Sequence, residues 1–86
     1  MSVYVDNMKA KYGTMIMCHM LADTEEELHE MAAKIGINKK WHQYPGTYKS
    51  HYDISLTKKD LAIKNGAILV NRRFIANLLK QRKNSE

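Results

Sequence analysis

The sequence is poor in residues that cross-link a small domain. Among 86 residues Cys18 is the only cysteine, so no disulfide can form within the chain. A lone cysteine inside an apolar run is typical of proteins kept in a reducing cytoplasm. A domain of this size buries only about 60% of the surface that its unfolded chain exposes. We therefore expect a single cytoplasmic domain over residues 1–86 that is stabilised by self-association, as a dimer or tetramer.

Long hydrophobic segments are also missing. The longest apolar run, Met15 to Ala22, is interrupted by His19 and is much shorter than the roughly 20 residues of a membrane helix. The first residues, Met1 to Asp6, lack the basic and apolar regions of a signal peptide. We expect neither secretion nor membrane insertion.

Motifs of the common catalytic and nucleotide sites are absent as well. There is no Walker loop, no G-x-G-x-x-G and no G-x-S-x-G. A strand would place Cys18 and His19 on opposite faces, so no Cys-His nucleophile pair is expected, and His19 is interpreted as a hydrogen-bonded core residue. His29, in a charged segment, is expected to be solvated. Possible metal ligands lie scattered without a compact spacing, so no metal or cofactor is predicted from Asp6, His19, His42, His51 and Asp53.

Charge is unevenly distributed along the chain. The formal net charge is +5, but five of the nine acidic residues lie between Asp23 and Glu30, a segment without lysine or arginine. The other four accompany all 14 lysines and arginines. Such a surface attracts anions, among them nucleotides, nucleic acids and acidic partners. The alternative is that the charge serves only solubility.

Hydrophobic patterns predict a small α/β (α+β) fold. Alternating residues predict strands from Ser2 to Val5 and from Thr14 to Leu21, joined by a polar loop from Asn7 to Tyr12. A helix follows, capped by Asp23 or Thr24, and its apolar residues recur at the spacing of one buried face. These residues are Leu28, Met31, Ala32 and Ile35. Thr24 with Glu27 forms a capping box, and Gly36 ends the helix.

The second half is predicted to contain a helix, a strand and a helix. Thr57 and Asp60 repeat the capping-box spacing and open a short helix. Ala67 to Val70 forms a strand, and Asn71 caps the last helix. Residues 80–86 are expected to fray as a basic tail. The expected architecture is a small mixed sheet with about three helices, in the order ββα, an irregular or β middle, then αβα.

The middle of the chain, Asn38 to Asp53, breaks these periodicities. It contains the only tryptophan and the only proline, three of the five tyrosines and two of the four histidines. Flat rings offer faces on which a base can stack, and cations hold phosphate. We therefore predict a phosphate-bearing, base-bearing ligand bound by Lys40, Trp41, His42, Tyr44, Tyr48, Lys49, His51, Tyr52 and Asp53. The alternative is that Trp41 and one or two tyrosines only cover the sheet.

Two further interpretations remain open. His51 could act as a general base oriented by Asp53, although on a strand the two would share a face without having to touch. Arg72 and Arg73, at the start of the last helix, are a further candidate anion site, because the N–H groups of a helix N-terminus favour phosphate.

Five segments can be compared with known families: Val3-Tyr-Val-Asp6, Cys18-His-Met-x-Ala-Asp-Thr-x-Glu-Glu-Leu-His-x-Met-Ala32, Trp41-His-Gln43, His51-Tyr-Asp53 and Gly66-Ala67. Together they resemble a small family of unknown-function domains found in phages, prophages and bacteria. The resemblance runs over nearly the whole chain.

The family label carries no activity, but the small size and the lysine- and asparagine-rich composition are similar to those of phage early proteins. Several unrelated small phage families form oligomers that sequester the nucleotide signals of bacterial immunity without cleaving them. The resemblance implies a homo-oligomeric phage protein in the infected host's cytoplasm that holds a cyclic dinucleotide without cleaving it. A nucleic-acid-binding protein and a small metal-dependent phosphodiesterase, built on the histidines and Asp53, are the alternatives.

Overall fold

The computed structural model describes residues 2–13 and 15–85. In these residues the strands form one sheet with the order β4-β5-β3-β1-β6, and β2 pairs with the first half of β3. The pairing of β1 with β6 is parallel and the other pairings are antiparallel. The predicted mixed sheet with helices is confirmed.

The strands and helices have the following bounds, in chain order. The strands are β1 (Val3–Asp6), β2 (Ala10–Tyr12), β3 (Met15–Ala22), β4 (His42–Gln43), β5 (His51–Ser55) and β6 (Ile68–Val70). The helices are α1 (Glu25–Lys34), the 3-10 turn η1 (Lys39–Trp41), α2 (Leu56–Lys64) and α3 (Arg72–Ser85). None of the helices within the described ranges has the length and hydropathy needed to cross a membrane.

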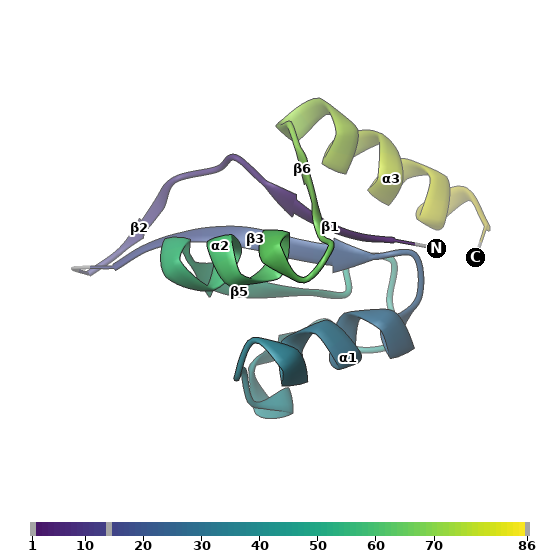
Figure 1. Cartoon of the computed structure of the whole chain (residues 1–86). Helices are drawn as coiled ribbons and strands as arrows, with labels where there is room; N and C mark the ends of the chain where they lie inside the picture. The colour runs from purple at the N-terminus through teal and green to yellow at the C-terminus, as the bar shows by residue number, and fades with distance from the viewer. Residues whose placement is uncertain (1, 14, 86) are drawn as a thin grey trace.

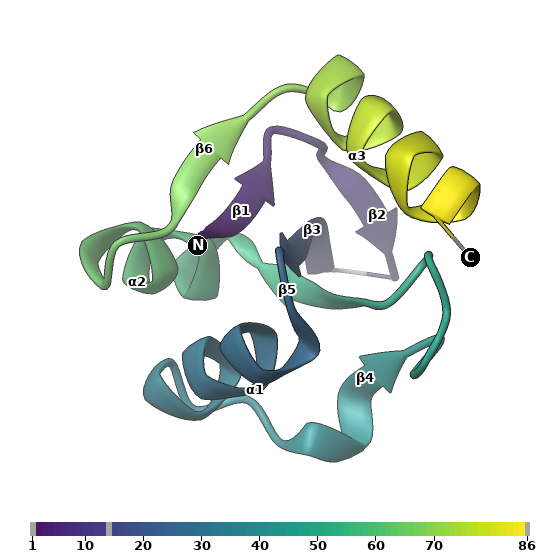
Figure 2. The same cartoon turned by 90° about the vertical axis from the view of Figure 1, so that its right-hand side faces the viewer.

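The helices lie on both faces of the sheet. Figures 1 and 2 show α1 and α2 on one side and α3 on the other. Because side chains alternate along a strand, β3 directs Cys18, Met20 and Ala22 toward α1 and α2. The hydrophobic core therefore lies between the sheet and these two helices. It also contains Val3, Val5, Leu28, Met31, Ala32, Ile35, Tyr52, Ile54, Ala62 and Ala67.

The opposite face of the sheet, here called the open face, has a polar part around His19 on β3 and Asp53 on β5. His19 and Asp53 are directly opposite each other in the β3–β5 register. Beside them α3 covers β1, where the rings of Tyr4 and Phe74 lie 4.9 Å apart. The open face is thus apolar under α3 and polar around His19 and Asp53.

Helix α1 begins and ends as its sequence predicts. Thr24 is the N-cap: its Oγ1 accepts from the Glu27 N–H at 3.2 Å and donates to Glu27 Oε1 at 2.9 Å. Thr24 and Glu27 thus pair at the predicted cap, although Glu27 accepts from the Thr24 hydroxyl and not from its backbone N–H as in a full capping box. The acidic first turn suits the positive end of the helix dipole. Gly36 follows with φ 81°, a left-handed conformation that glycine adopts without a steric cost.

The predicted loop from Asn7 to Tyr12 is wrong in its second half. Ala10–Tyr12 form β2, which pairs with β3 from Met15 to Met17. Gly13, with φ 63°, lies where the chain reverses between the two strands, so that β2 continues the sheet beside β3. Thr14, the predicted start of the second strand, lies outside the described residues.

The predicted capping box of the second helix is also wrong. The N-cap of α2 is Ser55, whose Oγ accepts from the Lys58 N–H at 3.2 Å. Thr57 lies inside the first turn and is exposed. The strand β5 runs directly into α2 without a loop, so the last strand residue takes the capping position.

The last helix begins at the predicted place but ends later. Asn71 Oδ1 accepts from the Phe74 N–H at 2.9 Å, which confirms Asn71 as the cap. Residues 80–85 of the expected frayed tail are helical, because α3 continues to Ser85, and residue 86 lies outside the described residues. The reason is Arg82, whose side chain is anchored to backbone carbonyls outside the helix.

The capping assignment of α2 can be tested by two alanine substitutions. Ser55→Ala removes the acceptor for an N-terminal N–H group and is expected to lower the free energy of unfolding by about 1 kcal/mol. Thr57→Ala, inside the exposed first turn, is expected to change it by less than about 0.5 kcal/mol. Urea unfolding followed by circular dichroism measures both, and a larger loss from Thr57→Ala would contradict the assignment.

Candidate functional site

The polar part of the open face is organised around Asp6, the last residue of β1. Its side chain is buried, and its Oδ1 accepts from the backbone N–H groups of His19 at 2.9 Å and Met8 at 3.2 Å. Its Oδ2 lies 2.8 Å from His19 Nδ1. Burial acts to raise the pKa of Asp6, but the hydrogen bonds from His19 and Met8 outweigh it and lower the pKa below its ordinary value. Asp6 is therefore an anionic acceptor that fixes the His19 ring.

Two histidines meet one carboxylate next to Asp6. His19 Nε2 lies 3.6 Å and His51 Nε2 lies 3.3 Å from the same atom, Asp53 Oδ1. The strand register places His19 opposite Asp53, and the two-residue spacing places His51 on the same face. The sequence did not require His51 and Asp53 to touch, but the structure brings them into contact. We call these three residues the open-face cluster.

A second group of possible metal ligands lies at the start of α1. Among the residues that the structure describes, the open-face cluster and the group Glu25, His29 and His42 are the two sets whose ligand atoms lie within 4.8 Å of one another. Glu25 Oε2 accepts from the Gly46 N–H at 3.1 Å and from Ser50 Oγ at 2.9 Å. These bonds hold the chain between β4 and β5 against α1, so this second group has a structural role.

The environment of His29 and Tyr52 corrects two predictions. His29 is not simply solvated, because its Nδ1 hydrogen-bonds the Tyr52 hydroxyl at 2.8 Å. Tyr52 has no exposed surface, so its ring offers no face on which a base could stack. His42 stacks on Tyr52 with ring centroids 5.3 Å apart, and its side chain is only 7% exposed. Tyr52 and His42 therefore belong to the interior and not to a ligand-binding surface.

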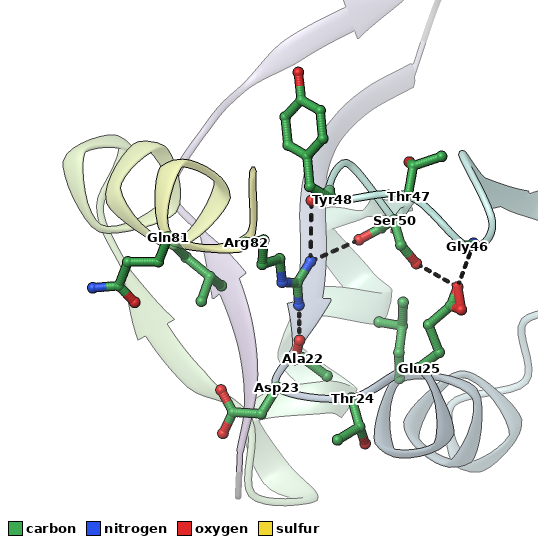
Figure 3. Close-up of a pocket in the computed structure, with 12 residues that line it drawn as sticks. Ala22, Asp23, Thr24, Glu25, Gly46, Thr47, Tyr48, Ser50, Gln81 and Arg82 are labelled. Carbon is green, nitrogen blue, oxygen red and sulfur yellow. Dashed lines mark hydrogen bonds between the residues drawn. The ribbon is translucent and has the colours of Figure 1, made fainter. Parts of the chain in front are cut away.

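Arg82 connects α3 to the end of β3 and to the segment before β5. Figure 3 shows its guanidinium reaching from α3 toward the end of β3 and the segment before β5. It donates to the carbonyl of Ala22, and to those of Tyr48 and Ser50 at 3.5 and 3.4 Å. Burial lowers the pKa of Arg82. A cleft beside Arg82 is lined by residues of α1, of α3 and of the segment before β5. Because the Arg82 donors are used on backbone carbonyls, they attach α3 to the sheet at this cleft.

A groove of about 690 Å³ lies between η1 and the end of β5. It is also lined by residues of β3, of α2 and of the segment after α1. Trp41 is one wall, with 57% of its surface exposed and Lys40 Nζ 5.3 Å from the ring centroid. Lys58 is another wall and is positioned by a 2.7 Å hydrogen bond from its Nζ to the Ile35 carbonyl. Asp53 lines the same groove, so the groove borders the open-face cluster.

The tyrosines predicted to bind a ligand are placed apart from this groove. Tyr44, 55% exposed, stacks on His51 with centroids 6.0 Å apart. Lys49 Nζ lies 5.6 Å from the Tyr44 ring and 5.7 Å from the Tyr48 ring. These contacts make an aromatic and cationic rim on the His51 side of the open-face cluster.

The structure places Arg72 and Arg73 away from both the groove and the cleft beside Arg82. Both are exposed in the first turn of α3, and neither lines the groove or the cleft beside Arg82. Cys18 is buried, and burial raises the pKa of its thiol to about 11. Cys18 lies in the core and His19 on the open face, so the two side chains are on opposite faces of β3 as the sequence predicted.

Sequence reasoning missed several residues that shape the site. Asp6 was considered only as one of several scattered metal ligands, and Arg82 was assigned to a frayed tail. Glu25 was read only as a charge in the first turn of α1. No local pattern reports that a residue will meet a partner far along the chain, and these contacts span 13 to 60 residues.

The fold and the site define a small α+β domain with a histidine and carboxylate cluster on one face of its sheet. The chain belongs to the family described as "Protein of unknown function (DUF4031)", whose model matches residues 3–82. The match spans both histidine groups and Arg82. No curated protein and no solved structure is similar enough to this chain to count as a match. Function must therefore be inferred from the site.

The role of Arg82 predicts a measurable loss of stability. Arg82→Ala removes charge-assisted hydrogen bonds to buried carbonyls and is expected to cost about 1.5–3 kcal/mol of unfolding free energy. Lys80→Ala, exposed on the same helix, is expected to change it by less than about 0.5 kcal/mol. Hydrogen exchange of residues 44–50 should accelerate in Arg82→Ala only. Equal stabilities of the two variants would contradict the anchor.

The burial of His42 predicts a pH-dependent stability. Burial, and secondarily the neighbouring His29, lower the pKa of His42 below the value of 6.5 expected in the unfolded chain. A histidine whose pKa is lowered by folding stabilises the fold above pH 6.5, and this contribution to stability is lost as the pH falls through the lowered pKa.

This contribution can be isolated with one variant. Unfolding free energies are compared for the unaltered chain and His42→Gln between about pH 7.5 and 5.5. The unaltered chain should lose more stability over this interval than His42→Gln, because only the unaltered chain contains the His42 imidazole. The other titrating groups are present in both proteins. Parallel curves for the two proteins would contradict the prediction.

Proposed function

We propose that this protein binds a nucleotide in the groove beside Trp41 and holds it without cleaving it, with a cyclic dinucleotide as the specific ligand. The observation that carries the proposal is the exposed indole of Trp41 in one groove with two lysines, Lys40 and Lys58. A base that stacks on such a ring gains about 1–3 kcal/mol. The ammonium groups supply charge-assisted hydrogen bonds to phosphate.

The exposure of Trp41 supports a ligand over a structural role. Large aromatic side chains are well buried on average, and exposed apolar surface along a groove is typical of ligand-binding sites. With 57% of its surface exposed, Trp41 is not a cover for the hydrophobic core. The volume of about 690 Å³ is within the range of small-molecule sites, about 300–1,000 Å³.

The proposal includes a homo-oligomer and a biological role. A groove on so small a domain is open to solvent, and a second subunit would enclose a dinucleotide more completely. The resemblance to small phage and bacterial proteins supports a nucleotide signal of antiphage immunity as the target, which the protein would withdraw from the host's signalling.

A second candidate function, hydrolysis of the bound phosphodiester, is favoured by one observation. Asp53 lines the groove and is also part of the open-face cluster, so a phosphate in the groove would lie beside two imidazoles and a carboxylate. Nucleic-acid binding has less support, because Arg72 and Arg73 lie outside the groove.

Nucleotide binding can be followed through Trp41, which is the only tryptophan in the chain. A panel of cyclic dinucleotides and mononucleotides is titrated into the protein, and quenching of the tryptophan fluorescence is expected on binding. By calorimetry, Trp41→Ala should weaken binding about 5- to 150-fold, the equivalent of one lost base stack. Arg72→Gln, outside the groove, serves as the matched control and should bind like the unaltered chain.

The fate of the ligand separates the two candidate functions. After incubation the protein is heat-denatured and the released ligand is analysed. Intact ligand supports sequestration, and a hydrolysed product supports the second candidate. Native mass spectrometry of the complex should give a dimer or tetramer. If no nucleotide binds by either method, both candidates are wrong.

A further inference from the structure

The hydrogen-bond partners of the open-face cluster determine which ring nitrogens carry protons. The Asp6 carboxylate and the Lys49 carbonyl can only accept hydrogen bonds. His19 Nδ1, 2.8 Å from Asp6, and His51 Nδ1, 2.6 Å from Lys49 O, must therefore each carry a hydrogen. In a neutral imidazole the other nitrogen is then an unprotonated acceptor. Both Nε2 atoms thus present lone pairs to Asp53 Oδ1.

Three lone-pair-bearing atoms in such proximity repel one another unless a proton or a metal ion lies among them. The two Nε2 atoms lie 3.6 and 3.3 Å from Asp53 Oδ1. In a tetrahedral zinc site with bonds of 2.0–2.1 Å, neighbouring ligand atoms are about 3.4 Å apart. The two distances to Asp53 Oδ1 are close to this value, and all three ligand atoms lie within 4.8 Å of one another, so a metal ion can be placed among them.

We propose that His19, His51 and Asp53 bind one divalent transition-metal ion of the zinc class. Two imidazoles and a carboxylate suit Zn²⁺, Fe²⁺ and Mn²⁺, whereas Ca²⁺ prefers oxygen ligands alone and Mg²⁺ keeps several of its waters. Asp6 and the Lys49 carbonyl orient the two rings from behind, as the outer carboxylates and carbonyls of zinc sites do.

The group of Glu25, His29 and His42 lacks these properties. Ser50 Oγ donates its one hydrogen to Glu25, so His42 Nε2, 2.6 Å from the same oxygen, must be the donor in that contact. A protonated nitrogen cannot bind a metal. Glu25 Oε2 also accepts from the Gly46 N–H. This group is similar in composition but differs in protonation, which makes it a matched control.

An ion bound at the open-face cluster would keep a coordination position that no protein ligand fills. Three protein ligands leave at least one position for water or for an anionic oxygen. Side-chain exposures of 30% for His19 and 27% for Asp53 leave the cluster open to solvent. Because Asp53 also lines the groove, an anionic group in the groove can reach that position. Metal binding does not depend on the proposed nucleotide, so it is tested with the metal alone.

The experiment is a titration of the metal-free full-length protein with Co²⁺, which reports its coordination by visible absorption. One equivalent per chain is expected to give a d–d band that Zn²⁺ abolishes and that excess Mg²⁺ or Ca²⁺ leaves unchanged. Asp53→Asn and His51→Gln should lose the band. Asp6→Asn keeps an oxygen that can accept from the backbone N–H groups of Met8 and His19, but its amide nitrogen cannot accept from His19 Nδ1, so it should weaken binding about 10- to 100-fold. His29→Gln in the control group should bind like the unaltered chain.

Three results would overturn the proposal: absence of stoichiometric binding, a band that persists in both Asp53→Asn and His51→Gln, or a band lost in His29→Gln. Circular dichroism checks that each variant is folded. Should the ligand variants unfold, NMR of the unaltered chain decides. One equivalent of Zn²⁺ must shift the ring signals of His19 and His51 more than those of His29 and His42, and the reverse order contradicts the site.

Discussion

Asp6 is buried where β1 leaves the sheet, and its carboxylate accepts hydrogen bonds from two backbone N–H groups and from the His19 ring. A buried carboxylate without these partners would be strongly unfavourable. With them it satisfies the backbone N–H groups of Met8, just after β1, and of His19 on β3, and it fixes the orientation of the His19 ring. The polar part of the open face depends on this interaction, because His19 is the member of the open-face cluster that β3 contributes.

The strand β5 divides its residues between the core and the site. Tyr52 and Ile54 are buried toward α1 and α2, whereas His51 and Asp53 lie on the open face. A slip of one residue in the β3–β5 register would exchange the two sets. The chain just before β5 is held from one side by the Glu25 carboxylate and from the other by Arg82, and these contacts reinforce the register.

Elements with strong local signals were predictable. The apolar spacing and the Thr24 cap of α1, and the cap of α3 at Asn71, are written in consecutive residues, and the structure has them where the sequence indicates. The cap of α2 was not predictable in this way, because Ser55 takes that position only when β5 runs directly into the helix. The aromatic and basic middle was recognised as unusual, but its division into groove, rim and interior was not.

The sequence by itself determined the fold class, the main helix and the concentration of chemically active side chains between Asn38 and Asp53. Only the tertiary structure decided which of them meet. The pairing of His19 with Asp53 depends on strand register, the burial of Tyr52 on the face that β5 turns to the core, and the anchoring of Arg82 on the docking of α3. Such long-range contacts are selected by packing of the whole domain, and no local pattern encodes them.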